Sequence, residues 1–208
     1  MIALLFSVFS SSLIFVLFKL FDRYKIDTFQ AIVFNYFTAF IIGFSLYGNQ
    51  WKSESLQETG WMVSAVICAL LFIGLFFIMG KSSQINGVAS TSVAVKMSMA
   101  ISIILMIIGY SESFTFLKIT GVIFAMLGVF LVSYSKGSKA SAAWMLLLLF
   151  IGSGALDFIL NYVQKYELGS MSTALFSAIG LGLAGILGLS ILIIRFIKGS
   201  AKFSFRTG

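Results

Sequence analysis

A lysine in the middle of a long apolar stretch is the first residue to which chemistry can be assigned. Lys96 lies ten residues after Asn86 in residues 86–110, which read NGVASTSVAVKMSMAISIILMIIGY. A helix rises ~1.5 Å per residue, so Lys96 is expected ~15 Å inside a hydrocarbon layer ~30 Å thick. A charge at that depth costs from ~2.5 to above 10 kcal/mol unless it faces a cavity, a partner or a ligand. We predict that Lys96 lies on a polar transport pathway; the alternative is a snorkelling or ion-paired structural lysine.

Asp157 and Asn161 form a second polar feature. They are four residues apart, so a helix places them on one face. Asp157 is the only carboxylate inside a predicted span, and it could carry a proton or bind an amine. Alternatively it lies near the outer interface, within reach of water. By helix rise Asp157 is ~22 Å deep, so a direct ion pair with Lys96 and a pair bridged by substrate or water are both open.

Hydroxyl groups surround Lys96 in the sequence. Ser92 lies one turn earlier on the same side and is predicted to join the pathway. Thr91, Ser98 and Ser102 form a neighbouring stripe. Serine and threonine in membrane helices often bond back to their own backbone, so most of this stripe is predicted to serve packing.

Two further polar residues lie within the second apolar stretch. Asn35 needs partners if it is buried, which makes it a candidate pathway residue. Tyr36 is the only tyrosine well inside a predicted span. Its hydroxyl either bonds a neighbouring helix or lines the pathway. The first stretch carries a serine cluster, Ser7 and Ser10 to Ser12.

The elements that must position these residues are membrane helices. The chain is 60% hydrophobic and 10% charged, and long apolar runs recur along its length. We predict an all-α integral membrane protein with seven transmembrane helices. They cover about residues 2–20, 29–47, 60–79, 86–110, 114–134, 142–163 and 172–197.

The charge balance fits a lipid bilayer rather than nucleic acid. The net charge is +7, but the basic residues are scattered singly between apolar runs. The chain has no histidine and one cysteine, Cys68, so it cannot form an intramolecular disulfide. No cofactor, no metal site and no enzymatic activity are expected, because a nucleophile–base or ligand constellation is missing. A retinal-binding photoreceptor is a weak alternative, since its lysine is expected in the last helix.

Loop charges predict the orientation. Three basic residues fall on one side: Lys52, Lys118 and Lys165. Ten fall on the other: Lys19, Arg23, Lys25, Lys81, Lys136, Lys139, Arg195, Lys198, Lys202 and Arg206. By the positive-inside rule the C-terminus is predicted to be cytoplasmic and the N-terminus outside.

An internal similarity suggests a repeat. Shifting the sequence by 142 residues places residues 18–26 on residues 160–168, and Gly43 on Gly185. The similarity begins directly after five predicted spans, and an odd number of crossings inverts the second copy. We predict a five-helix repeat over residues 1–135, the first two helices of an inverted repeat over 141–198, and a cytoplasmic tail over 199–208.

The chain resembles the EamA-type drug/metabolite transporter superfamily. The resemblance rests on the small-residue-rich fourth span ending in Gly109-Tyr110-Ser111-Glu112, and on Gly121 and Gly128 in the fifth. It implies ten helices in two halves, of which this chain carries seven. Members commonly have a proline in the fourth helix, whereas this chain has none, and many are thought to begin on the cytoplasmic side.

The resemblance implies a multi-pass transporter of the inner cell membrane. It would move a small polar or zwitterionic solute by alternating access. Lys96 would hold an anionic group, and Asp157 with Asn161 would hold an amine or a proton. The alternative is a truncated protein that is inactive alone, or that needs an oligomer or a partner to supply missing helices.

A glycine pattern in the last span is not a nucleotide site. Residues 180–185 fit G-x-G-x-x-G, but that fingerprint requires a strand before it in a soluble βαβ unit. Ala184 and Gly188, four residues apart, instead predict a small-residue face for close helix packing.

Overall fold

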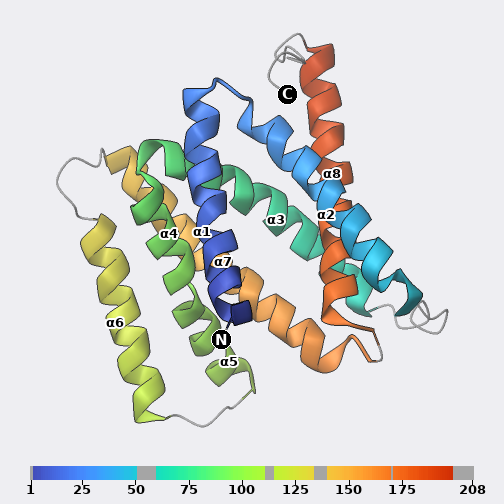
Figure 1. The fold of residues 1–208 in the computed structure, drawn as a ribbon. Coiled ribbons are helices and arrows are strands. Elements are labelled where there is room, and N and C mark those ends of the chain that lie inside the picture. The colour runs from blue at the N-terminus through green and yellow to red at the C-terminus, as the bar shows by residue number, and fades with distance from the viewer. Residues whose placement is uncertain (1, 51–59, 111–114, 134–139, 170, 199–208) are drawn as a thin grey trace. The chain divides into compact units, whose positions relative to one another are not determined.

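The computed structural model describes residues 2–50, 60–110, 115–133, 140–169 and 171–198 (Figure 1). The regular structure in these ranges is helical. The elements are α1 (Ile2–Arg23), α2 (Thr28–Tyr47), the 3₁₀ helix η1 (Gly48–Gln50), α3 (Gly60–Ile85), α4 (Val88–Met97), α5 (Met99–Tyr110), α6 (Phe116–Ser133), α7 (Ala140–Tyr166) and α8 (Thr173–Ile197).

Length and composition make these helices membrane-spanning. Six stretches of the described chain are long and apolar enough to cross a bilayer, with α4 and α5 counted as one, and α6 is a shorter apolar helix. A helix satisfies its own backbone hydrogen bonds, which hydrocarbon cannot do for it. The predicted seven-helix, all-α membrane fold is therefore confirmed.

The predicted fourth span, residues 86–110, is interrupted in its middle. α4 and α5 are separated at Ser98, whose hydroxyl donates to the carbonyl of Val95. The N–H of Ile101 bonds Ser98 O at 2.9 Å, a tighter pattern than in an α-helix. A serine that bonds back to the preceding turn often bends a helix. The break arises without the proline that is common in the resembling family.

The predicted third span also ends later than expected. α3 continues beyond residue 79 to Ile85. Lys81, which the charge count placed in a loop, therefore lies in the last turns of α3. Its ammonium is 4.8 Å from the centre of the Phe77 ring. The stem of Lys81 thus lies along the apolar surface of its own helix.

A tight polar turn connects α3 to α4. The Asn86 side-chain amide donates to Ser82 Oγ at 3.0 Å, and the hydroxyls of Ser82 and Thr91 are 2.9 Å apart. Gly87 has a φ of +87°, a conformation that favours glycine. The turn predicted from the Asn-Gly pair is confirmed.

Contacts divide the chain into two units. The first unit comprises Met1–Thr28 and Leu75–Phe158, and the second comprises Phe29–Gly74 and Ile159–Gly208. The boundaries fall inside α3 and α7, so each of these helices contributes a part to each unit.

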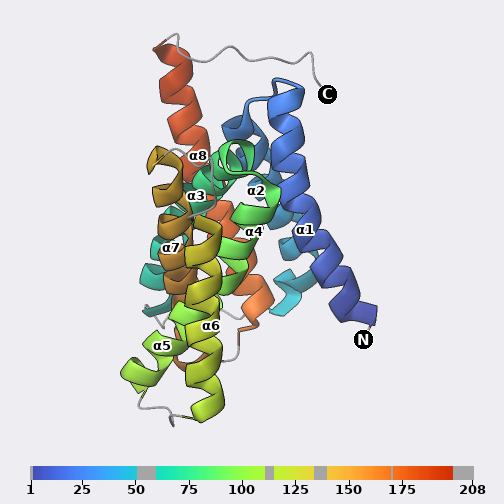
Figure 2. The same cartoon turned by 90° about the vertical axis from the view of Figure 1, so that its left-hand side faces the viewer.

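In the first unit α4 packs against α1 and α6, and α5 packs against α6 (Figure 1 and Figure 2). A small core of Ala100, Val129 and Phe150 joins α5, α6 and α7. This arrangement places the interruption at Ser98 among packed helices.

In the second unit α8 packs closely on α2 through small residues. A Cβ on Gly182 would lie 2.7 Å from the Phe40 ring, and one on Gly188 would lie 2.6 Å from Val33. Ala184 is fully buried. Gly182 contacts Phe40, whereas Gly188, which comes later in α8, contacts Val33, which comes earlier in α2. The two helices therefore run antiparallel. The predicted small-residue packing face is confirmed.

Candidate functional site

The ammonium of Lys96 is held by a hydroxyl from another helix. Lys96 lies in the last turn of α4, and its Nζ donates to Ser11 Oγ on α1 at 2.9 Å. The Ser11 hydroxyl in turn donates to the carbonyl of Val8 at 3.0 Å. Ser11 is therefore oriented to accept from the lysine. A neutral acceptor leaves the positive charge of Lys96 uncompensated, so it can still attract an anion.

The structure shows what the other hydroxyl groups near Lys96 do. Ser92 Oγ donates to the carbonyl of Ala89 at 2.9 Å, within its own helix. Ser98 bonds back in the same way and is fully buried. The Ser102 hydroxyl is also buried, and among the described residues it has no hydrogen-bond partner. Back-bonded hydroxyls contribute to packing and helix shape, as the sequence predicts for most of this stripe.

Asp157 lies along α7 just past the interruption. On α7, Gly154 approaches the break so closely that a Cβ there would lie 2.6 Å from Ser98 O. Four residues later, the Phe158 ring stacks at 5.8 Å on Tyr110, at the end of α5. Asp157 is half-buried between these two contacts. Lys96 is therefore on the α4 side of the break, whereas Asp157 belongs to the stretch of α7 that runs along α5.

The remaining predicted residues belong to the second unit. Tyr36 is fully buried, and its hydroxyl donates to the carbonyl of Phe72 on α3 at 2.8 Å. That bond is the helix-to-helix alternative considered for Tyr36. Asn35 on α2 and Asn161 on α7 are exposed on the surface of the chain.

Ser11 is the site residue that sequence reasoning missed. Its hydroxyl is the contact of Lys96, yet the two residues are 85 positions apart in the chain. The serine cluster in the first span was a usable signal, because repeated hydroxyls in an apolar helix invite a polar neighbour. Nothing in the sequence indicated which serine, or which neighbour, would be involved.

The glycines that carry the family resemblance lie in α5 and α6. Glu112 of the glycine–glutamate turn lies outside the described residues, as does the 199–208 tail. A Cβ on Gly121 or Gly128 in α6 would meet no atom within 4 Å.

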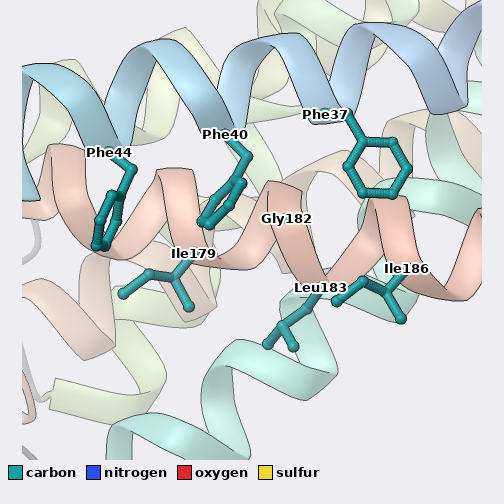
Figure 3. A pocket seen from close by; sticks show the side chains of 7 residues that line it. All are labelled: Phe37, Phe40, Phe44, Ile179, Gly182, Leu183 and Ile186. Carbon is teal, nitrogen blue, oxygen red and sulfur yellow. The ribbon is translucent and has the colours of Figure 1, made fainter.

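An apolar hollow lies between α2 and α8 in the second unit (Figure 3). Its volume is about 260 Å³. Phe37, Phe40 and Phe44 point toward α8 along one side of it, opposite Ile179, Gly182, Leu183 and Ile186. All its lining residues are apolar, so it suits hydrocarbon rather than a polar solute.

The fold and the intramembrane lysine define the class: a multi-pass membrane protein with polar residues inside its spans. The model of the EamA-like transporter family matches residues 1–134, more than half of the 208-residue chain. The chain belongs to that family.

The chain is also similar to a curated protein whose activity is uncharacterized. The chain is 27% identical over 173 residues to an uncharacterized protein of Haemophilus influenzae, covering 78% of this chain and 59% of the relative. This chain thus spans less than two thirds of that relative's length. No solved structure matches the chain.

Proposed function

We propose that this protein moves a small polar or zwitterionic solute across the membrane by alternating access, with Lys96 binding the anionic group of the solute. Membership of a transporter family supports the general activity. The contact between Lys96 and Ser11 is the observation that carries the role of Lys96.

The chemistry of this contact favours an exchangeable partner. A lysine ammonium has three N–H donors, and one neutral hydroxyl uses one of them. A carboxylate forms stronger, charge-assisted hydrogen bonds with an ammonium than a hydroxyl does. A carboxylate of the solute can therefore replace the Ser11 hydroxyl as the acceptor from Lys96. No buried ion pair has to be broken, a step that would cost about 3–5 kcal/mol.

Asp157 is the proposed partner for the amine of a zwitterion, or for a proton. It belongs to the same unit as Lys96 and lies on the other side of the interruption at Ser98. Ser92 is proposed to line the pathway beside Lys96. A pathway role for Asn161 and Asn35 stays a prediction, whereas the buried Tyr36 hydroxyl is proposed to serve the contact between α2 and α3.

Transport by the purified chain in proteoliposomes tests the role of Lys96. The panel contains zwitterionic amino acids, matched carboxylates without the amine, and matched amines without the carboxylate. Lys96→Met should abolish transport of every carboxylate-bearing member while the protein still inserts and purifies normally. Lys96→Arg should keep part of the activity, and Lys118→Met, the same change in α6, should keep all of it. Full transport by Lys96→Met refutes the assignment.

A double-mutant cycle tests the role of Asp157. If Lys96 and Asp157 bind the two ends of one solute, Lys96→Met and Asp157→Asn should not have additive effects on transport. Additive losses exclude this coupling.

The same vesicles test the second predicted function, a chain that transports only with a partner. Activity present in native membranes but absent after reconstitution of the purified chain supports that function. Equal activity in both excludes it.

A further inference from the structure

We propose that the C-terminal ends of α1 and α3 bind the headgroup of an anionic membrane phospholipid, with Lys19 and Lys81 contacting its phosphate. Both residues belong to the first unit, and neither takes part in the proposed transport pathway. The proposal is independent of the solute and of the transport mechanism.

The helix ends that carry the two lysines are packed together. Lys19 Nζ donates to the carbonyl of Gln84, in the last turn of α3, at 2.6 Å. The Gln84 amide donates back to the carbonyl of Phe18 at 3.1 Å. A Cβ on Gly80 would lie 3.5 Å from the Phe18 ring. Lys19 therefore follows Phe18 on α1, and Lys81 follows Gly80 on α3, and Phe18 and Gly80 lie against each other.

Both ammonium groups are held in place by neutral groups. Lys19 is fixed by a carbonyl, and Lys81 lies 4.8 Å from the centre of the Phe77 ring. Both side chains are exposed. Among the residues that the structure describes, neither lysine forms an ion pair. Each ammonium therefore retains N–H donors for an anion.

Both lysines lie near the C-terminal ends of their helices. Lys19 precedes the last residue of α1 by four positions, and Lys81 precedes the last residue of α3 by four. At the rise of a helix, each lysine therefore lies about 6 Å inside its helix end. Both are near the edge of the hydrocarbon, where long basic side chains extend toward phosphate groups.

The local charge favours an anion. Arg23 lies one turn after Lys19 on the same face of α1, and Lys25 follows in the turn. Asp22 and Asp27 are the exposed acids nearby, so the four basic residues leave a positive excess. The charge count predicts that this end faces the cytoplasm, and the cytoplasmic leaflet carries anionic lipids. A phospholipid supplies both the phosphate and acyl chains that can lie along the exposed apolar faces of these helices.

Native mass spectrometry of the purified chain in detergent measures the binding. The probes are phosphatidylglycerol and phosphatidylethanolamine with identical acyl chains, together with free glycerol phosphate. Phosphatidylglycerol should bind more tightly than phosphatidylethanolamine, and glycerol phosphate should not displace it. Removing each lysine should weaken phosphatidylglycerol binding about fivefold, because a basic residue near an anionic surface contributes that much.

Variants separate this site from general attraction to positive charge. Lys19→Gln combined with Lys81→Gln should remove most of the selectivity, whereas Lys118→Gln combined with Lys165→Gln should leave it unchanged. Lys19→Arg combined with Lys81→Arg should retain it. Lys81→Gln alone removes no hydrogen bond and so tests the site even if the double variant folds poorly. Unchanged binding by Lys81→Gln, equal binding of the two lipids, or displacement by glycerol phosphate each overturns the proposal.

Discussion

The ammonium of Lys96 on α4 donates to the hydroxyl of Ser11 on α1 at 2.9 Å, so this cation is held by a neutral group. This bond links two helices that also pack against each other. It should therefore contribute to stability as well as to function.

The first prediction concerns the strength of this bond. Lys96→Met and Ser11→Ala should show a coupling of about 1 kcal/mol in the free energy of unfolding, since hydrogen bonds between membrane helices contribute on this order. Circular dichroism during sodium dodecyl sulfate titration from mixed micelles measures it. Ser12→Ala is the matched control, because Ser12 bonds the Val8 carbonyl within its own helix. Its effect should add to that of Lys96→Met. Additivity for Ser11→Ala would contradict the contact.

The second prediction concerns the close approach of α7 to the interruption. Gly154→Ala places a methyl group 2.6 Å from Ser98 O and should lower the free energy of unfolding by about 1–3 kcal/mol. Gly121→Ala in α6 meets no atom within 4 Å. It should be neutral, or stabilising by up to about 1 kcal/mol, because alanine restricts the unfolded chain. If the two variants unfold alike, the packing of Gly154 on Ser98 is not as described.

The third prediction separates structure from function at Tyr36. Tyr36→Phe removes the bond to the Phe72 carbonyl and should destabilise the protein by about 0.5–1.5 kcal/mol. Transport by the folded variant should keep its affinity and rate, because the hydroxyl is buried in a helix contact. Tyr24→Phe, at an exposed tyrosine, should change neither stability nor transport. A Tyr36→Phe variant of normal stability but weakened solute affinity would instead support the pathway role.

The fourth prediction concerns the end of α1. Lys25 has a φ of 56°, and the N–H of Ile26 bonds Phe21 O at 2.8 Å. This is a Schellman ending with lysine at a position that favours glycine. Lys25→Gly should raise the free energy of unfolding by about 1 kcal/mol, because a side chain in the left-handed region costs about that much. Lys25→Ala keeps the strain and should show no such gain. An equal gain in both variants would point to the lost charge instead.

The seven membrane helices could be predicted from the sequence alone. Hydropathy is a local property, so each apolar run identifies its own helix regardless of its neighbours. The bounds of α2 and α8 lie within one residue of prediction for this reason. The small-residue face around Gly188 could be predicted equally well, since residue size and helical spacing are both present in the sequence.

The break at Ser98 could not be predicted, although its residue was noted. Many serines in membrane helices bond back without interrupting the helix, as Ser190 does in α8. At Ser98 a tighter backbone bond coincides with the approach of Gly154 from α7. The chain has no proline, which pointed away from a kink. Proline is only one cause of helix kinks, and the other causes depend on contacts that the sequence does not show.

The sequence by itself determined that this is a multi-pass membrane protein with a cation inside its fourth span. Only the tertiary structure decided that Ser11 holds that cation, and that Lys96 and Asp157 belong to one unit while Asn35, Tyr36 and Asn161 belong to another. The physical reason is that the cost of burying a charge depends on residue type and depth. Which residue contacts the charge depends on helix packing, because packing joins residues that are far apart in the chain.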